Sequence, residues 1–339
     1  MTIQFLKTNV IPHGMAPSDE LRALGLVEVC GRTAYKSEDK ITRDSARSFV
    51  LMLKKHHHLS VLEHSNIVLK FELDPGDEAW SVVPSLSDIR ESFLRCLQER
   101  NAYHRIHLLP DGPSGAFAVA GNFRGWIETL EHLEEAGAGL CRLLTYHLNQ
   151  SHPSLFASET EIPPGLPCAV SLMKEEEQLE LLKKDPRCDL PVFVFHIVCD
   201  RGITHELVRH RVLSFTQEST RYVNYRNKGM TLILPEELEP FYDEEREELK
   251  QGEPLVESWM ERGQALFQWY QEDIGRGLRP EIARDILPNL LKSEIFVSGR
   301  WSGWKHFVNL RDSKAAHPRI RLIARQVRAY FESLGMAFE

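Results

Sequence analysis

The segment of this sequence that most restricts its fold is the apolar run Pro191–Cys199. It reads Pro-Val-Phe-Val-Phe-His-Ile-Val-Cys, and its β-branched and aromatic residues favour a strand. A strand with apolar residues on both faces must be covered on both faces, so it is expected inside a sheet that lies between helices. The chain has 339 residues, which is long enough to bury a large core around such a strand.

Two further segments predict strands, Ser65–Leu73 and Met230–Leu234. Each is apolar, contains β-branched residues and is followed directly by a turn with proline. Most of the remaining chain shows the spacing of helices. Helices are expected at 18–57, over most of 77–150, and from 252 onward. No internal repeat of the solenoid type is visible. A few strands among many helices predict an α+β fold.

The charge of the chain restricts its partners. It has 41 Lys and Arg against 49 Asp and Glu, which gives a formal net charge of −8. A general nucleic-acid binder would carry a basic domain, so no nucleic acid is expected as a partner. No apolar stretch approaches the ~20 residues that span a bilayer. The first residues also lack the basic and apolar regions of a signal peptide. We expect a cytoplasmic protein without membrane contact.

One segment departs from this acidic background. Residues 200–228, directly after the predicted central strand, contain six Lys and Arg but only three Asp and Glu. Arginine is suited to planar, bidentate binding of phosphates and of rings that carry carbonyl groups. Short polar residues lie between these arginines, and Phe215, Tyr222 and Tyr225 offer stacking surfaces. The segment predicts a site for a flat, phosphorylated ligand.

The same residues have other interpretations. A surface network of Arg and Glu that caps the strand would need the same charges and would bind no ligand. A metal site is not expected, because His205 and His210 lack the spacing that places two ligands on one helix face. Ser219 would need an adjacent base to act as a nucleophile, so we interpret it as a binding residue.

A motif in this segment resembles a known family. Arg209-His-Arg211, followed after seven residues by Ser219, is similar to the R-H-R-x7-S signature of the flavin-dependent thymidylate synthases. The next residues, Ser219-Thr-Arg-Tyr222, resemble the S-x-R-Y of that family. Four further segments resemble other elements of the family. They are Cys30–Ser37, Ser60–His64 (S-V-L-E-H), 280–288 (P-x-x-A-R-x-x-L-P) and 305–311 (K-H-F-V-N-L-R).

The resemblance implies a fold and an activity. The fold would be a central antiparallel sheet flanked by helices, in a single domain over 1–339 with a mostly helical insertion at about 74–190. The activity would be reductive methylation of dUMP to dTMP, with methylenetetrahydrofolate as carbon donor, FAD as hydride carrier and NAD(P)H as reductant. The assembly would be a homotetramer. Two alternatives remain open, a paralogue that methylates another uracil nucleotide and a non-catalytic nucleotide-binding module.

The resemblance also implies roles for single residues. Arg311 would sit against the pyrimidine, where its permanent charge favours ionisation of N3 and so activates the ring. The residues implied to bind the flavin are His64, Asn66, Arg209, His210, Arg211, Gln217 and His306. Those implied to bind the nucleotide are Glu206, Arg209, Gln217, Ser219, Thr220, Arg221, Arg284 and Arg311, with Arg221 and Arg284 at the phosphate.

The sequence departs from the family at two elements. Arg300 and Ser302 stand where compact members carry the Asn and Arg of an N-x-R element, and Glu206 stands where many members have Gln. A segment similar to the missing element, Gly121-Asn-Phe-Arg-Gly-Trp126, lies within the extra block. It has two interpretations, a replacement for the missing flavin contacts or the start of a helix with a buried tryptophan.

Overall fold

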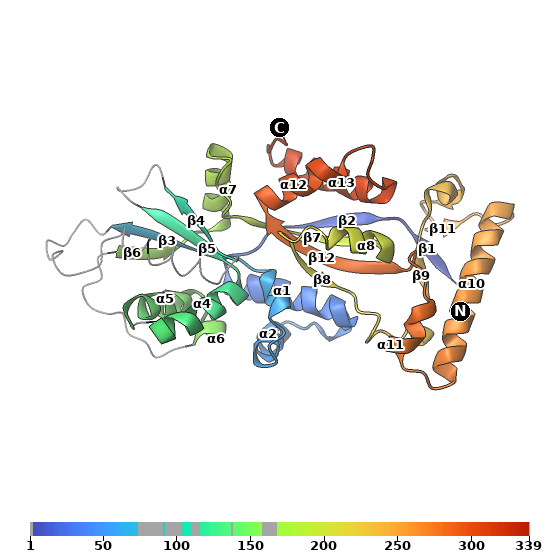
Figure 1. Cartoon of the computed structure of the whole chain (residues 1–339), viewed down its shortest axis with the longest axis horizontal. Helices are drawn as coiled ribbons and strands as arrows, with labels where there is room; N and C mark the ends of the chain where they lie inside the picture. The colour runs from blue at the N-terminus through green and yellow to red at the C-terminus, as the bar shows by residue number, and fades with distance from the viewer. Residues whose placement is uncertain are drawn as a thin grey trace.

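The computed structural model describes residues 3–73, 91, 103–109, 116–136, 138–157 and 168–338 (Figure 1). Parts of the expected insertion at about 74–190 therefore lie outside the described residues. Within the described part, no helix is both long enough and apolar enough to cross a membrane.

The predicted central strand is β7, Val192–Asp200, and it lies inside a four-stranded antiparallel sheet. It pairs on one side with β2 (Asn9–Met15) and on the other with β12 (Lys292–Arg300). The second edge of β12 pairs with β8 (Ser214–Gln217). All residues of β7 are buried or half-buried, as expected for a strand that is covered on both faces. The prediction of an α+β fold around an antiparallel sheet is confirmed.

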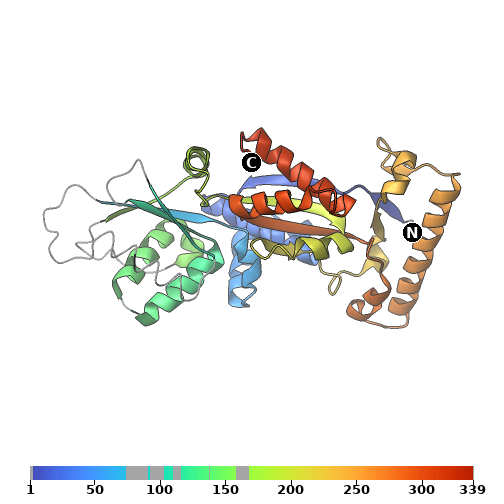
Figure 2. The same ribbon diagram turned by 45° about the horizontal axis from the view of Figure 1, so that its top comes forward.

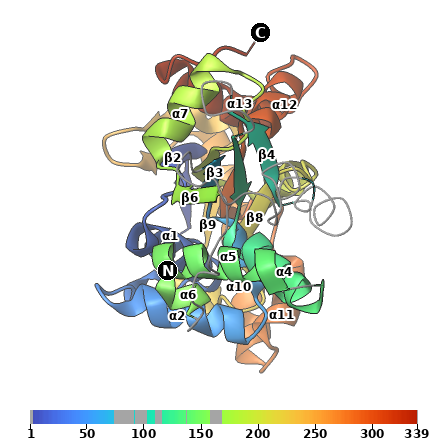
Figure 3. The same cartoon turned by 90° about the vertical axis from the view of Figure 1, so that its left-hand side faces the viewer.

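Helices cover both faces of this central sheet (Figure 2). On one face lie α12 (Trp301–Arg311) and α13 (Pro318–Ser333), whose first turn contains proline as helix starts often do. On the other face lies α1 (Glu20–Tyr35), with α2 (Ser45–Lys55) packed against it. Both helices fall in the region 18–57 that was expected to be helical. Figure 3 shows the strands as a layer between these two groups of helices.

The predicted strand at Ser65–Leu73 forms β3, Ile67–Leu73, in a second four-stranded antiparallel sheet at one end of the molecule (Figure 1). The strands lie in the order β4 (Arg105–Leu108), β5 (Phe117–Gly121), β3 and β6 (Cys168–Leu172). The helices beside this sheet are α4 (Phe123–Ala136), α5 (Ala138–Ser151), α6 (Pro153–Phe156) and α7 (Glu175–Lys184). The three strands β4, β5 and β6 within this block were not expected.

A third, smaller cluster of apolar residues closes the other end of the molecule around α10 (Pro254–Gly275). There β1 (Gln4–Leu6) pairs in parallel with β9 (Thr231–Ile233), which is the third predicted strand. The short elements of the chain are η1 (Glu38–Lys40), η2 (Leu59–Glu63), α9 (Tyr225–Lys228), η3 (Glu236–Phe241), β10 (Tyr242–Asp243), β11 (Glu248–Leu249), α11 (Pro280–Ala283) and η4 (Arg284–Ile286).

The helical expectation from 252 onward is wrong at Lys292–Arg300, which form β12. The run Ile295-Phe-Val297 has the β-branched and aromatic character of a buried strand. Its place between β7 and β8 removes its backbone groups from water and pairs them on both sides. Sheet pairing outweighs the helical spacing of the flanking residues.

Candidate functional site

The R-H-R segment lies in the turn between β7 and β8. The Asp200 carboxylate at the end of β7 accepts a backbone N–H of the short helix α8 (Arg201–Leu207) at 2.9 Å and so caps it. After α8 the chain turns, and Arg209 and Arg211 are exposed while His210 between them is buried. The turn therefore presents two cations outward and one imidazole inward.

Arg311 at the end of α12 binds this inward-facing imidazole. Its Nε donates to His210 Nε2 at 3.0 Å, and its Nη1 donates to Glu206 Oε2 at 2.9 Å. The ring of His306 lies 6.0 Å from that of His210, measured between centroids. The structure thus brings together four of the predicted site residues, and an arginine neutralises the carboxylate that stands where many family members have Gln.

His210 is neutral in this cluster. Its pKa is lowered to about 4 by burial first, and then by its neighbours Arg311 and His306. Because its Nε2 accepts a hydrogen bond from Arg311, the proton of the neutral ring is assigned to Nδ1. The imidazole therefore orients the guanidinium without competing with it for charge.

The residues after the R-H-R segment do not all face one way. Thr220 Oγ1 accepts a hydrogen bond from Arg284 Nη1 at 3.2 Å, and Ser219 Oγ accepts the backbone N–H of Arg221 at 3.3 Å. The Arg221 side chain is exposed, with its guanidinium carbon 5.5 Å from the centroid of the Tyr222 ring. Of the two arginines predicted at the phosphate, Arg284 is held by Thr220 and Arg221 points outward.

Gln217 and Ser219 line a cavity of about 540 Å³ beside α1. Gln217 Nε2 donates to Thr204 Oγ1 at 2.9 Å and to Ser293 Oγ at 3.0 Å, which fixes its amide. The aromatic wall of the cavity is made by Tyr35 and Tyr222, whose ring centroids are 5.4 Å apart. This cavity has the size of a small-molecule site and offers a stacking surface.

His64 and Asn66, the two predicted flavin residues outside this segment, are buried. His64 Nε2 is 2.8 Å from Thr216 Oγ1, and burial lowers the pKa of its ring to about 3. Asn66 Nδ2 donates to the Leu190 carbonyl at 3.0 Å and to Gln178 Oε1 at 3.2 Å. Their observed contacts join protein elements, and their role in flavin binding stays a prediction.

A partly buried charge network beside the site was not predicted from the sequence. Glu218 accepts from Lys292 at 3.3 Å and lies 3.5 Å from Lys36, and both lysines also pair with Glu294. Burial raises the pKa of the Glu294 carboxyl, but the hydrogen bond from His196 and the two lysines outweigh it and lower the pKa well below its usual range. Glu294 lies on β12, so the missed strand hid this network.

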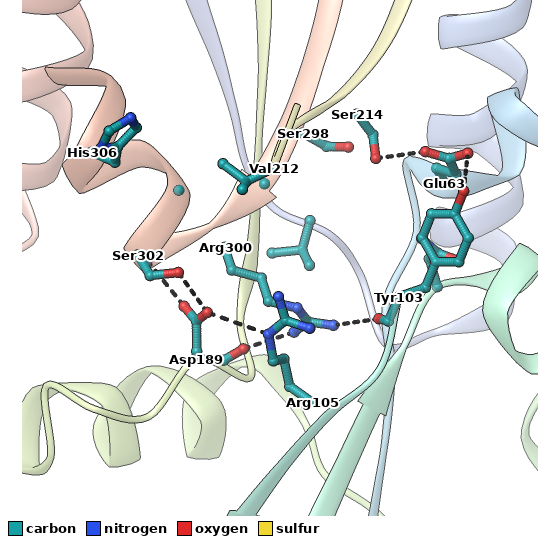
Figure 4. A pocket seen from close by; sticks show the side chains of 14 residues that line it. Glu63, Tyr103, Arg105, Asp189, Val212, Ser214, Ser298, Arg300, Ser302 and His306 are labelled. Carbon is teal, nitrogen blue, oxygen red and sulfur yellow. Dashed lines mark hydrogen bonds and ion pairs between the residues drawn. The ribbon is translucent and has the colours of Figure 1, made fainter. Parts of the chain in front are cut away.

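A second cavity, of about 310 Å³, lies where the two sheets meet (Figure 4). Arg300 crosses its wall, where Nη1 donates to the carbonyls of Asp189 at 2.9 Å and Leu190 at 2.5 Å, and Nη2 donates to the Tyr103 carbonyl at 3.2 Å. Burial lowers the pKa of Arg300 to about 10, so it stays charged at neutral pH. Ser302 Oγ donates to the Asp189 carboxylate at 2.6 Å. Arg300 is therefore committed to backbone carbonyls.

The region that contains almost all of these residues matches a known family. Residues 188–334 match the model of the family described as thymidylate synthase complementing protein. This part of the chain is similar to that family. The matched residues include β7, β8, β12 and every predicted site residue except His64 and Asn66. The resemblance stated from the sequence is confirmed at the level of the family.

Curated relatives of the family carry the name flavin-dependent thymidylate synthase. The protein of Pyrococcus abyssi is 36% identical over 135 residues, which cover 39% of this chain and 51% of that protein. The protein of Aquifex aeolicus is 22% identical over 315 residues, 88% of this chain and 91% of that one. This chain thus spans about half the length of the first of these relatives. Among solved structures, a UMP/dUMP methylase, PolB, from Streptomyces cacaoi is 22% identical with a TM-score of 0.35, covering 48% of this chain and 78% of that one.

Proposed function

We propose that this protein methylates dUMP reductively to dTMP in the cytoplasm, with methylenetetrahydrofolate as carbon donor, FAD as hydride carrier and NAD(P)H as reductant. The observation that supports this best is the contact of Arg311 with His210, because it joins the two most specific elements of the family, R-H-R and H-F-x-x-L-R, in one cluster. Self-association as a homotetramer belongs to the same proposal.

Arg311 is the proposed catalytic residue. Its guanidinium keeps its charge at any working pH, and Glu206 and His210 fix its orientation through Nη1 and Nε. Its Nη2 has a weaker contact, 3.4 Å from the Glu206 carbonyl, so this nitrogen is best suited to donate to a pyrimidine. A fixed cation beside N3 would stabilise negative charge as it develops on the ring.

The residues of the R-H-R turn fit a flavin dinucleotide. Arg209 and Arg211 are exposed and form no ion pair with any described residue, so both guanidinium groups are available for phosphates. FAD would supply hydride transfer when bound. Arg209, Arg211 and His306 would hold it, while Arg284 and Arg221 would hold the nucleotide phosphate, with Thr220 keeping Arg284 in place.

The proposal is tested first by the visible spectrum of the purified protein. NADPH oxidation is then followed with dUMP, with UMP and without nucleotide, each in the presence of methylenetetrahydrofolate. A flavin spectrum with thymidylate formed from dUMP supports the proposal. Turnover with UMP instead would move the substrate to uridylate. A protein that cannot be loaded with FAD and forms no product would contradict the proposal and favour the alternative of a non-catalytic nucleotide-binding module.

A further inference from the structure

The two four-stranded sheets share the chain path of three of their strands. In the C-terminal unit, which we define as 189–333 with β2, the strands β7, β8 and β12 lead into α12. In the N-terminal unit, the described residues within 63–172, β3, β4 and β5 lead into α4. The first sheet has the order β2-β7-β12-β8 and the second β6-β3-β5-β4, and all pairs are antiparallel. Three strands and the helix after them therefore follow the same path in the two units, whereas the outer strand β2 precedes β7 and its counterpart β6 follows α4.

Equivalent residues make equivalent contacts in the two units. Gly121 pairs with Ile67 in the N-terminal unit, and Gly299 pairs with Phe193 in the C-terminal unit. The tryptophan five residues after each glycine donates its indole N–H to that same partner: Trp126 to the Ile67 carbonyl and Trp304 to the Phe193 carbonyl, both at 3.2 Å. The segments also align in sequence, as A-V-A-G-N-F-R-G-W over 118–126 and F-V-S-G-R-W-S-G-W over 296–304.

The units contact each other in a reciprocal way. Glu63 and Asp189 stand the same distance before Ile67 and Phe193. Glu63 accepts a hydrogen bond from Ser214 of the other unit at 2.7 Å (Figure 4). Asp189 in turn pairs with Arg105 of the other unit at 3.8 Å. Arg105 and Ser214 hold equivalent positions, since they pair with the residue just before Gly121 and Gly299. Such an exchange of equal contacts is the sign of a two-fold interface.

The 310 Å³ cavity lies at this interface. Equivalent residues from both units line it, as four pairs: Glu63 and Asp189, Tyr103 and Val212, Arg105 and Ser214, Asn122 and Arg300. Asn122 directly precedes α4 and Arg300 directly precedes α12, so the N-termini of these two helices lie at the cavity. Helix N-termini favour groups that carry negative or partly negative oxygens.

Two side chains in the cavity wall are left to bind a ligand. Ser298 is 2% exposed, and its Oγ has no hydrogen-bond partner in the described structure. Asn122 is 7% exposed and caps α4 with its Oδ1, which accepts the N–H of Gly125 at 2.7 Å, while its amide nitrogen bonds to no described residue. By contrast the charged residues are paired, Glu63 with Arg124 and Asp189 with Arg105. An uncharged ligand with carbonyl oxygens matches these donors.

We infer that the chain is an internal duplication, and that the cavity between its two copies is a composite site for a pyrimidinedione ring. Asn122 of the N-terminal unit and Ser298 of the C-terminal unit donate to the two carbonyl oxygens of that ring. The N-terminal unit thus fills the place of a second subunit within one chain. The ring is shared by flavin and uracil, and this ligand assignment rests on the proposed function.

The test measures the binding of FAD and, separately, of dUMP to the full-length protein. Asn122→Ser keeps the helix cap and removes the amide donor. Ser298→Ala gives the C-terminal unit the alanine that the N-terminal unit has at the equivalent position, Ala120. Asn309→Ser, at an exposed residue of α12 outside the cavity, is the matched control. Thermal melting of each variant checks the fold.

We expect each cavity variant to raise the Kd of one of the two ligands about five- to tenfold, which is the range for one lost hydrogen bond. The control variant should leave both Kd values unchanged. Whether FAD or dUMP is affected identifies the ring. Variants that bind both ligands like the wild type would overturn the composite site, whatever the turnover. Sensitive binding without thymidylate formation would overturn the proposed function and leave the composite site standing. A wild-type protein that binds neither ligand would overturn both.

Discussion

In the C-terminal unit α12 carries His306 and Arg311, whereas the aligned positions of α4 in the N-terminal unit carry Glu128 and Leu133. Both helices nevertheless begin with the same glycine and tryptophan contacts to the neighbouring strand. The positions that hold the helix on the sheet are alike, and those that would touch ligands differ. The glycine and tryptophan are shared because both helices pack on the sheet in the same way. His306 and Arg311 have no counterparts in α4, because they belong to the proposed ligand site of the C-terminal unit alone.

The largest effect is expected from the shared tryptophans. Trp126 and Trp304 are fully buried and make the same bond. Changing either to alanine removes a large side chain from the core, so Trp126→Ala and Trp304→Ala should each lower the free energy of unfolding by about 3–5 kcal/mol. Urea unfolding measures both. A near-neutral result for one variant alone would break the equivalence of the two units.

The duplication explains what the sequence could and could not predict. Continuous apolar runs identified β7 and β3, and the R-H-R spacing identified the residues around His210. The copy was not visible as a repeat, because few of its aligned residues are identical and the likeness lies in strand register and in the two indole hydrogen bonds. Likewise, the pairing of Glu63 with Ser214 joins residues far apart in sequence, which no local pattern reports.

Arg311→Leu gives the C-terminal unit the residue of the N-terminal unit. If the charge of Arg311 stabilises the activated ring, kcat should fall by about 10²–10³-fold, the usual loss on removing one such donor. The flavin spectrum should stay, since Arg209 and Arg211 are untouched. Arg276→Leu, at the exposed arginine directly after α10, serves as the control. Turnover that survives in Arg311→Leu would show that the two units do not differ in chemistry at this position.

The two glycines test how closely the copies are packed. A methyl group on Gly299 would lie 2.2 Å from Leu213 Cδ2, the mobile end of a flexible side chain. On Gly121 it would lie 2.7 Å from His104 Nε2 and 2.9 Å from Trp126 Nε1, which belong to rigid rings. Overpacking costs about 1–3 kcal/mol, so Gly121→Ala should stand near the upper end and Gly299→Ala near the lower. Equal unfolding energies would mean that the two sites relax alike.

The last effect depends on pH and concerns His104, whose equivalent in the C-terminal unit is Leu213. Burial, and then the charges of Arg300 and Arg105, lower the pKa of His104 to about 3. In the unfolded chain the imidazole binds a proton below about pH 6.5, whereas in the folded chain it stays neutral down to about pH 3. The free energy of unfolding is therefore not reduced by His104 above pH 6.5, and it falls as the pH drops from 6.5 towards 3. The loss is about 1.4 kcal/mol per pH unit.

His104→Leu gives the N-terminal unit the residue of the C-terminal unit. The variant has no side chain at this position that can bind a proton in the unfolded chain. The difference in unfolding energy between wild type and variant should then grow in favour of the variant by about 1.4 kcal/mol for each pH unit between 6 and 4, because only the wild type must keep a neutral imidazole in the core. Urea unfolding at several pH values measures it. Parallel pH profiles would mean that His104 is protonated to the same extent in the folded and the unfolded protein, so that burial does not lower its pKa.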